Sequence, residues 1–162
     1  MRKRNSGMPR SPRQIRKRDL VVKIASEAEK KLLWQNRVEF EVEPEKARFS
    51  WEHGKTFVAL LNGEIVAYCQ AHYIPKNLAV ISRISAVRNM KYKGIGRTLI
   101  GRVEGYYIRK GVKKFYGYSA IPIKNFYAKT GHEITEVAGQ RADFEREIKT
   151  RRKPQKLRNI RI

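Results

Sequence analysis

Two glycines separated by one residue, Gly94 and Gly96, lie between two apolar stretches of different character. The stretch before them, 78–87, is rich in β-branched residues and is typical of a strand. The stretch after them, 97–110, repeats its apolar residues every four positions and predicts an amphipathic helix. Glycine lets a backbone approach a ligand closely, and the first amides of a helix have no intrahelical partners and carry the positive end of the helix dipole. The pattern therefore predicts a site for a phosphate or pyrophosphate.

The spacing of this loop distinguishes between known phosphate-binding sequences. A dinucleotide fingerprint needs a third glycine where Leu99 stands and an acidic residue about 20 positions later, and neither is present. A Walker loop needs Gly-Lys-Ser/Thr, whereas Gly96 is followed by Arg97 and Thr98. The loop instead resembles the Arg/Gln-x-x-Gly-x-Gly/Ala acetyl-CoA loop of the GNAT N-acetyltransferases, with Lys91 at the Arg/Gln position. The alternative is a tight turn between a strand and a helix that binds no ligand.

A second stretch carries the same resemblance. After a predicted strand at 112–119, Pro122 and Gly131 are placed to open and close a short helix. The sequence Phe-Tyr-Ala-Lys-Thr-Gly-His that ends at His132 is similar to the family signature Phe-Tyr-x-x-x-Gly-Phe, with histidine in place of the last phenylalanine. The resemblance implies that Tyr127 reaches the thioester sulfur and protonates the leaving thiolate. The alternative is a helix tyrosine that packs on the sheet.

The resemblance covers roughly residues 20–148, and its specific motifs lie in 78–132. It implies an α/β fold with a mixed, mostly antiparallel sheet flanked by helices. It also implies direct transfer of acetyl from acetyl-CoA to an amine, with no covalent enzyme intermediate and no metal. The residues expected to hold acetyl-CoA are Ala86, Val87, Lys91, Tyr92, Lys93, Gly94, Ile95, Gly96, Arg97 and Thr98.

The general base has no obvious candidate, because neither 78–87 nor 112–120 contains a carboxylate. A lysine amine, with a pKa of about 10.4, must lose a proton before it attacks, whereas an α-amine titrates at about 7.7–8.0. His72 and Glu133 are the nearest candidates, and a relayed water is an equal alternative. The pattern favours an acceptor of lower pKa, such as an aminoacyl ester on tRNA or a protein N-terminus, over a lysine side chain.

Alternating glutamates precede these motifs, at positions 39, 41, 43 and 45. Side chains two residues apart share one face of a strand. The face is either a solvated surface or an acidic lip that attracts a cationic acceptor amine.

The 162-residue chain is long enough for one domain with a substantial core. It contains no apolar run of transmembrane length, and no apolar stretch follows its charged start, which excludes a secretory signal. The arginine-rich stretch before Asp19 leaves an organelle transit peptide open as an alternative. Cys69 is the only cysteine, so an intrachain disulfide and a cysteine zinc site are excluded, and a reducing, cytoplasmic location is favoured.

Positive charge is concentrated at both ends of a chain whose formal net charge is +22. Residues 1–19 carry eight Lys or Arg and one Asp, and residues 149–162 carry seven and no acid. These segments predict two basic arms around a domain at 20–148. Such charge attracts polyanions, so the predicted partner is a nucleic acid or a ribonucleoprotein particle. The alternative is a charge bias that serves solubility alone.

Two other functions remain open beside acetyl transfer. A GNAT-like domain without catalysis would bind nucleic acid or a ribonucleoprotein through its arms, and a GNAT-fold enzyme could instead modify a nucleobase. Retention of Gly94, Gly96 and Tyr127 favours the catalytic alternative. The sequence does not indicate an oligomeric state.

Overall fold

The computed structural model describes residues 20–37, 40, 54–87, 94–120, 124–139 and 141–149. Within these ranges the chain forms three helices and seven strands. In chain order they are β1 (Leu20–Ile24), α1 (Glu27–Gln35), β2 (Lys55–Leu61), β3 (Glu64–Ile74), β4 (Leu78–Ala86), α3 (Ile95–Ile108), β5 (Lys114–Ala120), α4 (Lys124–Lys129), β6 (Glu133–Ala138) and β7 (Arg141–Glu147).

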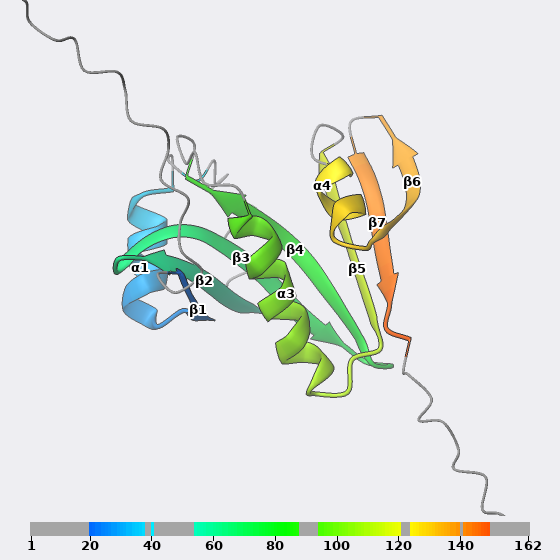
Figure 1. Cartoon of the computed structure of the whole chain (residues 1–162), viewed down its shortest axis with the longest axis horizontal. Coiled ribbons are helices and arrows are strands. Elements are labelled where there is room, and N and C mark those ends of the chain that lie inside the picture. The colour runs from blue at the N-terminus through cyan, green and yellow to red at the C-terminus, as the bar shows by residue number, and fades with distance from the viewer. Residues whose placement is uncertain are drawn as a thin grey trace, which may run out of the picture.

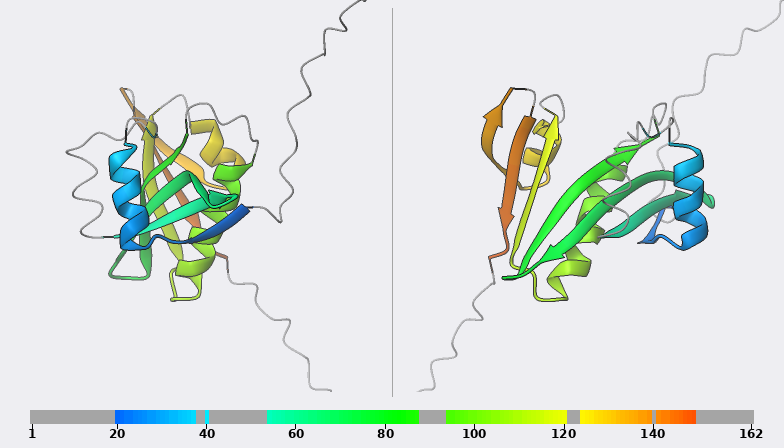
Figure 2. Two further views of the ribbon diagram at one scale, coloured as in Figure 1. Left: turned by 90° about the vertical axis from the view of Figure 1, so that its left-hand side faces the viewer. Right: turned by 180° about the vertical axis from the view of Figure 1, so that it is seen from behind.

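The strands form one sheet in the order β1-β2-β3-β4-β5-β7-β6. Every neighbouring pair is antiparallel except β4 and β5, which are parallel and connected by α3. Helix α1 covers one face of the sheet, and α3 and α4 cover the other (Figure 1). Figure 2 shows the sheet between these helices from two further sides. The expected mixed, mostly antiparallel sheet flanked by helices is confirmed.

Helix α1 begins at the capping box that the sequence contains. The Ser26 hydroxyl accepts a hydrogen bond from the Glu29 amide at 3.3 Å, and the Glu29 carboxylate accepts one from the Ser26 amide at 2.8 Å. These reciprocal bonds satisfy donors that the start of a helix leaves without partners. The helix packs on the sheet through Leu33, which contacts a small core with Val58 and Tyr68.

Helix α3 presents the predicted apolar stripe to the larger core. Leu99, Val103 and Tyr107 are buried there against β2, β3 and β4. The Tyr107 hydroxyl donates to the Ala71 carbonyl at 2.8 Å, which ties the helix to the middle of β3. Gly111 ends the helix in the left-handed region, at a φ of 89°, where glycine has no steric penalty.

The hairpin of β2 and β3 turns at Asn62-Gly63, a residue pair that favours a two-residue turn. Both residues have positive φ, 53° and 86°, which is the requirement of a type I′ turn. Side chains alternate across these strands, so Phe57 faces the core under α3 while Val58 faces the core under α1. The strands therefore carry apolar residues on both faces.

Most elements differ from their expected bounds by one or two residues. The helix expected at 97–110 runs from Ile95 to Ile108, and the strand expected at 112–119 from Lys114 to Ala120. Alternating residues at 132–138 and 143–149 predict two last strands, and the structure has them at Glu133–Ala138 and Arg141–Glu147. The ends of a strand depend on how far its pairing partners extend, and sequence periodicity carries no information about those partners. Several expectations lie outside the described residues: the N-terminal arm, the C-terminal arm after Lys149, the glutamates at 39–45, Pro122, and loop residues Lys91, Tyr92 and Lys93.

Candidate active site

Strands β4 and β5 begin side by side and then separate. Their parallel pairing runs from Leu78 opposite Lys114 to Ile81 opposite Gly117, although β4 continues to Ala86 and β5 to Ala120. Figure 2 shows the two strands diverging beyond the paired ends. The facing backbone edges of both strands are therefore unpaired with each other past Ile81 and Gly117. An extended ligand can hydrogen-bond to such an edge as an added strand does.

A bulge in β4 marks the start of the separation. The register between β3 and β4 pairs Gln70 with Arg83 and Ala71 with Ile81, so Ser82 is the extra residue. The Ser82 hydroxyl donates to the Gln70 carbonyl at 3.2 Å. A bulge bends its strand and increases the local twist. The bend directs the end of β4 away from β5.

Gly117 occupies the last paired position of β5, where the neighbouring atoms leave no room for a side chain. A Cβ atom there would lie 2.6 Å from the Ile81 carbonyl oxygen and 2.4 Å from the Phe144 ring. Neither neighbour is the end of a flexible side chain, since one is backbone and the other a buried ring. Only glycine fits this position without displacement of the sheet.

The first turn of α3 presents backbone amides beside the diverging strands. Gly94 is the N-cap, with a φ of 98°, and its carbonyl accepts from the Thr98 amide at 3.0 Å. This leaves the amides of Ile95, Gly96 and Arg97 without intrahelical partners. The first turn contains no acid, and the Arg97 and Thr98 side chains are exposed. The arrangement suits an anion, because the positive end of the helix dipole, the free backbone amides and the Arg97 side chain all attract negative charge.

The two glycines of the loop have different surroundings. A Cβ atom on Gly94 would meet nothing within 4 Å, so this backbone is open to a ligand. A Cβ atom on Gly96 would lie 2.9 Å from the Phe126 ring of α4. Gly96 therefore lets α4 pack against the start of α3, with Ile84 nearby. This contact brings the two sequence motifs together in space.

Tyr127 projects from α4 into the core. Its side chain is 1% exposed, and its ring stacks on Phe144 with the centroids 3.7 Å apart. Burial raises the pKa of the phenol well above its ordinary value, so the hydroxyl keeps its proton at neutral pH. A proton donor must be protonated, and that condition is met. Its action on a thiolate stays a prediction.

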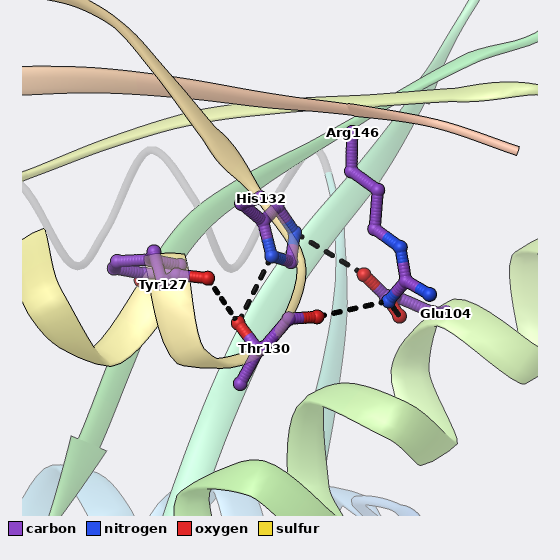
Figure 3. Close-up of polar contacts among 5 residues, drawn as sticks. All are labelled: Glu104, Tyr127, Thr130, His132 and Arg146. Carbon is purple, nitrogen blue, oxygen red and sulfur yellow. Dashed lines mark hydrogen bonds and ion pairs between the residues drawn. The ribbon is translucent and has the colours of Figure 1, made fainter.

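His132 fills the signature position of phenylalanine with a polar cluster (Figure 3). Its Nε2 lies 3.1 Å from Glu104 Oε1, a close electrostatic contact without the alignment of a hydrogen bond. Arg146 donates to the other Glu104 oxygen at 2.6 Å and to the Thr130 carbonyl at 3.2 Å. The Thr130 hydroxyl lies 2.8 Å from the Tyr127 carbonyl, to which it donates, and 3.0 Å from His132 Nδ1.

This cluster was missed by sequence reasoning, although two signals for it exist. Glu104 stands four residues after buried Ile100, so it continues the inner face of α3. A charged residue on such a face needs a buried partner. The histidine after Gly131 stands where the signature has an apolar ring, and it is the complementary signal. The cluster joins α3 to β7 and to the loop before β6.

Comparison with known proteins identifies the family of this fold and site. The profile of the Acetyltransferase (GNAT) family matches residues 25–132, which is most of the chain. The chain belongs to the GNAT acetyltransferase family. None of the curated protein sequences is a significant match to this GNAT chain.

Solved structures of GNAT proteins share the fold at low sequence identity. A GNAT family acetyltransferase from Elizabethkingia anophelis with acetyl-CoA bound has a TM-score of 0.67 and 16% identity, with 82% of this chain and 100% of that chain covered. An acetyltransferase from Bacillus subtilis in complex with CoA has a TM-score of 0.68 and 12% identity, with 80% of this chain and 99% of that chain covered. The ribosomal-protein-S18-alanine N-acetyltransferase from Escherichia coli has a TM-score of 0.67 and 14% identity, with 81% of this chain and 95% of that chain covered.

Neither expected base of this GNAT chain lies on the separating edges. His72 is opposite Val80, within the paired half of β4. Glu133 lies on β6, opposite Glu145 of β7, so β7 and β5 separate it from β4. Among the described residues, no group of histidines, cysteines or carboxylates could hold a metal ion. No helix of the described ranges is long and apolar enough to cross a membrane.

A carboxylate that sequence reasoning missed lies on the strand beside β5. Asp143 accepts from the Tyr116 hydroxyl at 2.6 Å and from Arg141 Nε at 2.6 Å. The hydrogen bond from Arg141, followed by that from Tyr116, holds the pKa of Asp143 below its ordinary value. Such a carboxylate is a weak base, but its charge can hold an ammonium group. With Glu136 and Ala138 it lines a hollow of about 280 Å³.

Proposed function

We propose that this GNAT chain transfers acetyl from acetyl-CoA to an amine on a macromolecule associated with nucleic acid or the ribosome. The observation that carries the proposal is the separation of β4 from β5 beside the open first turn of α3. An extended thiol arm with a pyrophosphate at one end matches those two features together. The Elizabethkingia anophelis and Bacillus subtilis proteins, which share this fold, were solved with acetyl-CoA and CoA.

In the proposed mechanism each group acts through a feature already described. The amides of residues 95–97 hold the pyrophosphate, Arg97 adds charge, and Gly94 lets the backbone approach. The free edge of β4 up to Val87 hydrogen-bonds the extended arm and fixes the thioester. The deprotonated acceptor amine attacks the thioester carbonyl and releases a proton to solvent as the amide forms. The carbon–sulfur bond breaks, Tyr127 donates its proton to the leaving thiolate, and the phenolate then regains a proton from solvent.

The acceptor we propose has an amine of low pKa. None of the described residues of β4 and β5 is a carboxylate, so the described parts of these two strands do not supply a general base. An α-amine, on a protein N-terminus or an aminoacyl-tRNA, is about half deprotonated near pH 8 without help. The Escherichia coli protein of the same fold is named for acetylating an alanine of ribosomal protein S18. The basic arms in the sequence support a partner of this kind. The single cysteine, Cys69, supports a reducing, cytoplasmic place of action.

One other function keeps specific support. The fifteen Lys or Arg residues of the two terminal segments would serve a nucleic-acid-binding protein that has lost catalysis. Acetyl-CoA binding distinguishes the alternatives, because only the enzyme requires it.

The deciding experiment compares Gly94→Trp with Gly111→Trp. Both glycines flank α3, both have positive φ (98° and 89°), and a Cβ atom on either meets nothing within 4 Å. The backbone strain is therefore matched, but only Gly94 lies where the pyrophosphate is proposed. We expect calorimetry with acetyl-CoA to show lost binding for Gly94→Trp and retained binding for Gly111→Trp.

Equal affinity in both variants would reject the proposed site. Acceptors are then identified by mass spectrometry after incubation of wild type with isotopically labelled acetyl-CoA and a lysate. Nuclease treatment of the lysate before incubation should prevent labelling of the acceptor. Labelling that is insensitive to nuclease would refute the nucleic-acid association while leaving acetyl transfer intact.

A further inference from the structure

Charge is unevenly distributed over the described body of the protein. Residues 95–114 contain six Lys or Arg and one acid, Glu104. That acid is 4% exposed and already contacts Arg146 and His132, and it forms no ion pair with any of these six cations. The β6–β7 hairpin has the opposite balance, since residues 133–147 carry five acids and two Lys or Arg. Helix α3 and the loop after it therefore form the cationic side of this body.

Six exposed cations continue from α3 onto the end of the sheet where β4 and β5 are paired. Backbone hydrogen bonds hold the segments together: the Lys113 amide donates to the Asn77 carbonyl at 2.8 Å, and the Ile148 amide to the Lys113 carbonyl at 2.8 Å. Figure 1 shows the end of α3, the β3–β4 turn and the end of β7 gathered there. We call this surface the α3 basic face, and its members are Lys76, Arg102, Arg109, Lys110, Lys113 and Lys149.

The fold itself explains only part of this face. Arg109 and Lys110 follow the last turn of α3, where cations stabilise the negative end of the helix dipole. Lys114, just outside the face, is neutralised by Glu145 at 2.7 Å. Arg102 has neither reason, because it stands in the middle of the helix and no described carboxylate forms an ion pair with it. Like charges so close together repel one another and cost stability.

The geometry of α3 suits an extended chain of negative charges. Arg102 and Arg109 are seven residues apart, so they point to the same side and stand about 10.5 Å apart along the axis. Gly105 lies between Arg102 and Arg109 on that side and places no side chain between these two cations. Lys110 is held over the Tyr106 ring at 5.2 Å, which orders its ammonium group. The sequence after Lys149 adds six more Lys or Arg.

We propose that the α3 basic face binds the phosphate backbone of a nucleic acid. The cations lie on adjoining segments, they exceed what the helix dipole and ion pairs use, and they continue into a basic segment of sequence. Contacts of this type position a nucleic acid without reading its sequence. The proposal goes beyond acetyl transfer and does not depend on it, since the face is built from side chains outside the proposed acetyl-CoA residues.

The test compares two double variants of the full chain. Arg102→Gln with Lys113→Gln removes two charges from the face, and Lys31→Gln with Lys55→Gln removes two exposed charges from α1 and β2. None of the four side chains has an ion-pair partner among the described residues. Binding to a fluorescent single-stranded RNA and to a duplex DNA is measured against salt concentration.

We expect the face variant to bind more weakly and to lose about 1.4 units of the log–log salt slope on RNA and about 1.8 on duplex DNA. The control should keep the wild-type slope. Equal losses in both variants would show diffuse attraction to net charge and would overturn the proposal, as would no loss in either. Preferential loss of binding to phosphatidylserine vesicles, with nucleic-acid binding unchanged, would assign the face to a membrane surface instead.

Acetyl-CoA affinity is measured on the same samples. It should be equal in wild type and in both double variants, because none of these residues lies in the first turn of α3. A face variant with normal acetyl-CoA affinity and normal salt slope refutes the phosphate-backbone surface alone. Failure of wild type to bind acetyl-CoA refutes the proposed enzyme and leaves the result on the face valid.

Discussion

Replacing Gly117 by alanine tests the packing at the point where the sheet divides. The added methyl group would lie 2.4 Å from Phe144 Cζ and 2.6 Å from the Ile81 carbonyl oxygen, well inside contact distance. The carbonyl belongs to the last pair of β4 and β5, so it cannot retreat without breaking that pair. The ring is fully buried and stacked on Tyr127, so its movement would displace a second ring.

The size of the effect follows from two opposing contributions. Overpacking a rigid core costs about 1–3 kcal/mol, and the upper end applies here because a backbone atom and a stacked ring must both move. Loss of glycine flexibility in the unfolded chain returns about 0.4–1 kcal/mol. We therefore expect Gly117→Ala to lower the free energy of unfolding by about 2 kcal/mol. At about 2–4 °C per kcal/mol, Tm should fall by roughly 4–8 °C.

Urea denaturation followed by circular dichroism measures this change, with Gly101→Ala as the matched control. A Cβ atom on Gly101 meets nothing within 4 Å and the residue is an exposed helix position, so alanine there should stabilise by about 0.5–1 kcal/mol. The free energies of unfolding of the two variants should therefore differ by about 3 kcal/mol, with Gly117→Ala less stable and Gly101→Ala more stable than wild type. A Gly117→Ala protein as stable as wild type would refute the claim that this position admits only glycine.

Three further substitutions test the site and its supports. Tyr127→Phe should reduce turnover by ~10²–10⁴ with acetyl-CoA affinity unchanged, and turnover within twofold of wild type would remove Tyr127 from the mechanism. Glu104→Leu removes the carboxylate between His132 and Arg146 and should lower the free energy of unfolding, measured by urea denaturation, by about 3 kcal/mol. The loss is smaller than for a fully buried ion pair because Arg146 is 35% exposed. An unchanged urea midpoint would contradict this. The pKa of Asp143 is lowered on folding, so its contribution is complete above the unfolded value of about 3.9 and is lost as pH falls through the folded value. Asp143→Asn should therefore lower Tm at neutral pH and flatten its acid decline, and an unaltered Tm–pH curve would argue against this.

The sequence predicted those elements whose signal is local. The capping box at Ser26, the Asn62-Gly63 turn and the apolar stripe of α3 each rest on a few neighbouring residues. Short-range sterics and hydrogen bonding determine such features. The GNAT resemblance added the order of the elements and brought the Gly94 loop and the Tyr127 helix into one site.

What the sequence did not predict depends on contacts between distant strands. The bulge at Ser82 arises from pairing with β3, and the end of the β4–β5 pairing is set by where two separate strands diverge. Gly117 carried a signal, since an isolated glycine within a strand indicates close backbone approach, but its neighbours Ile81 and Phe144 are known only from the fold. The Asp143 network likewise required the register that places β7 beside β5.

The parallel pairing of β4 and β5 also bears on how the protein unfolds. It consists of four residue pairs that join positions 36 residues apart in sequence, so forming this seam costs chain entropy that local hairpins do not pay. We expect strands β1–β4 and strands β5–β7 with α4 to open as two units, joined by this short pairing, by α3, by the Glu104 contacts and by the core that contains both Ile81 and Phe144. A ligand that hydrogen-bonds to both separating edges bridges the two units. Its binding therefore makes amide exchange in both halves slow together, and it couples their unfolding into one transition.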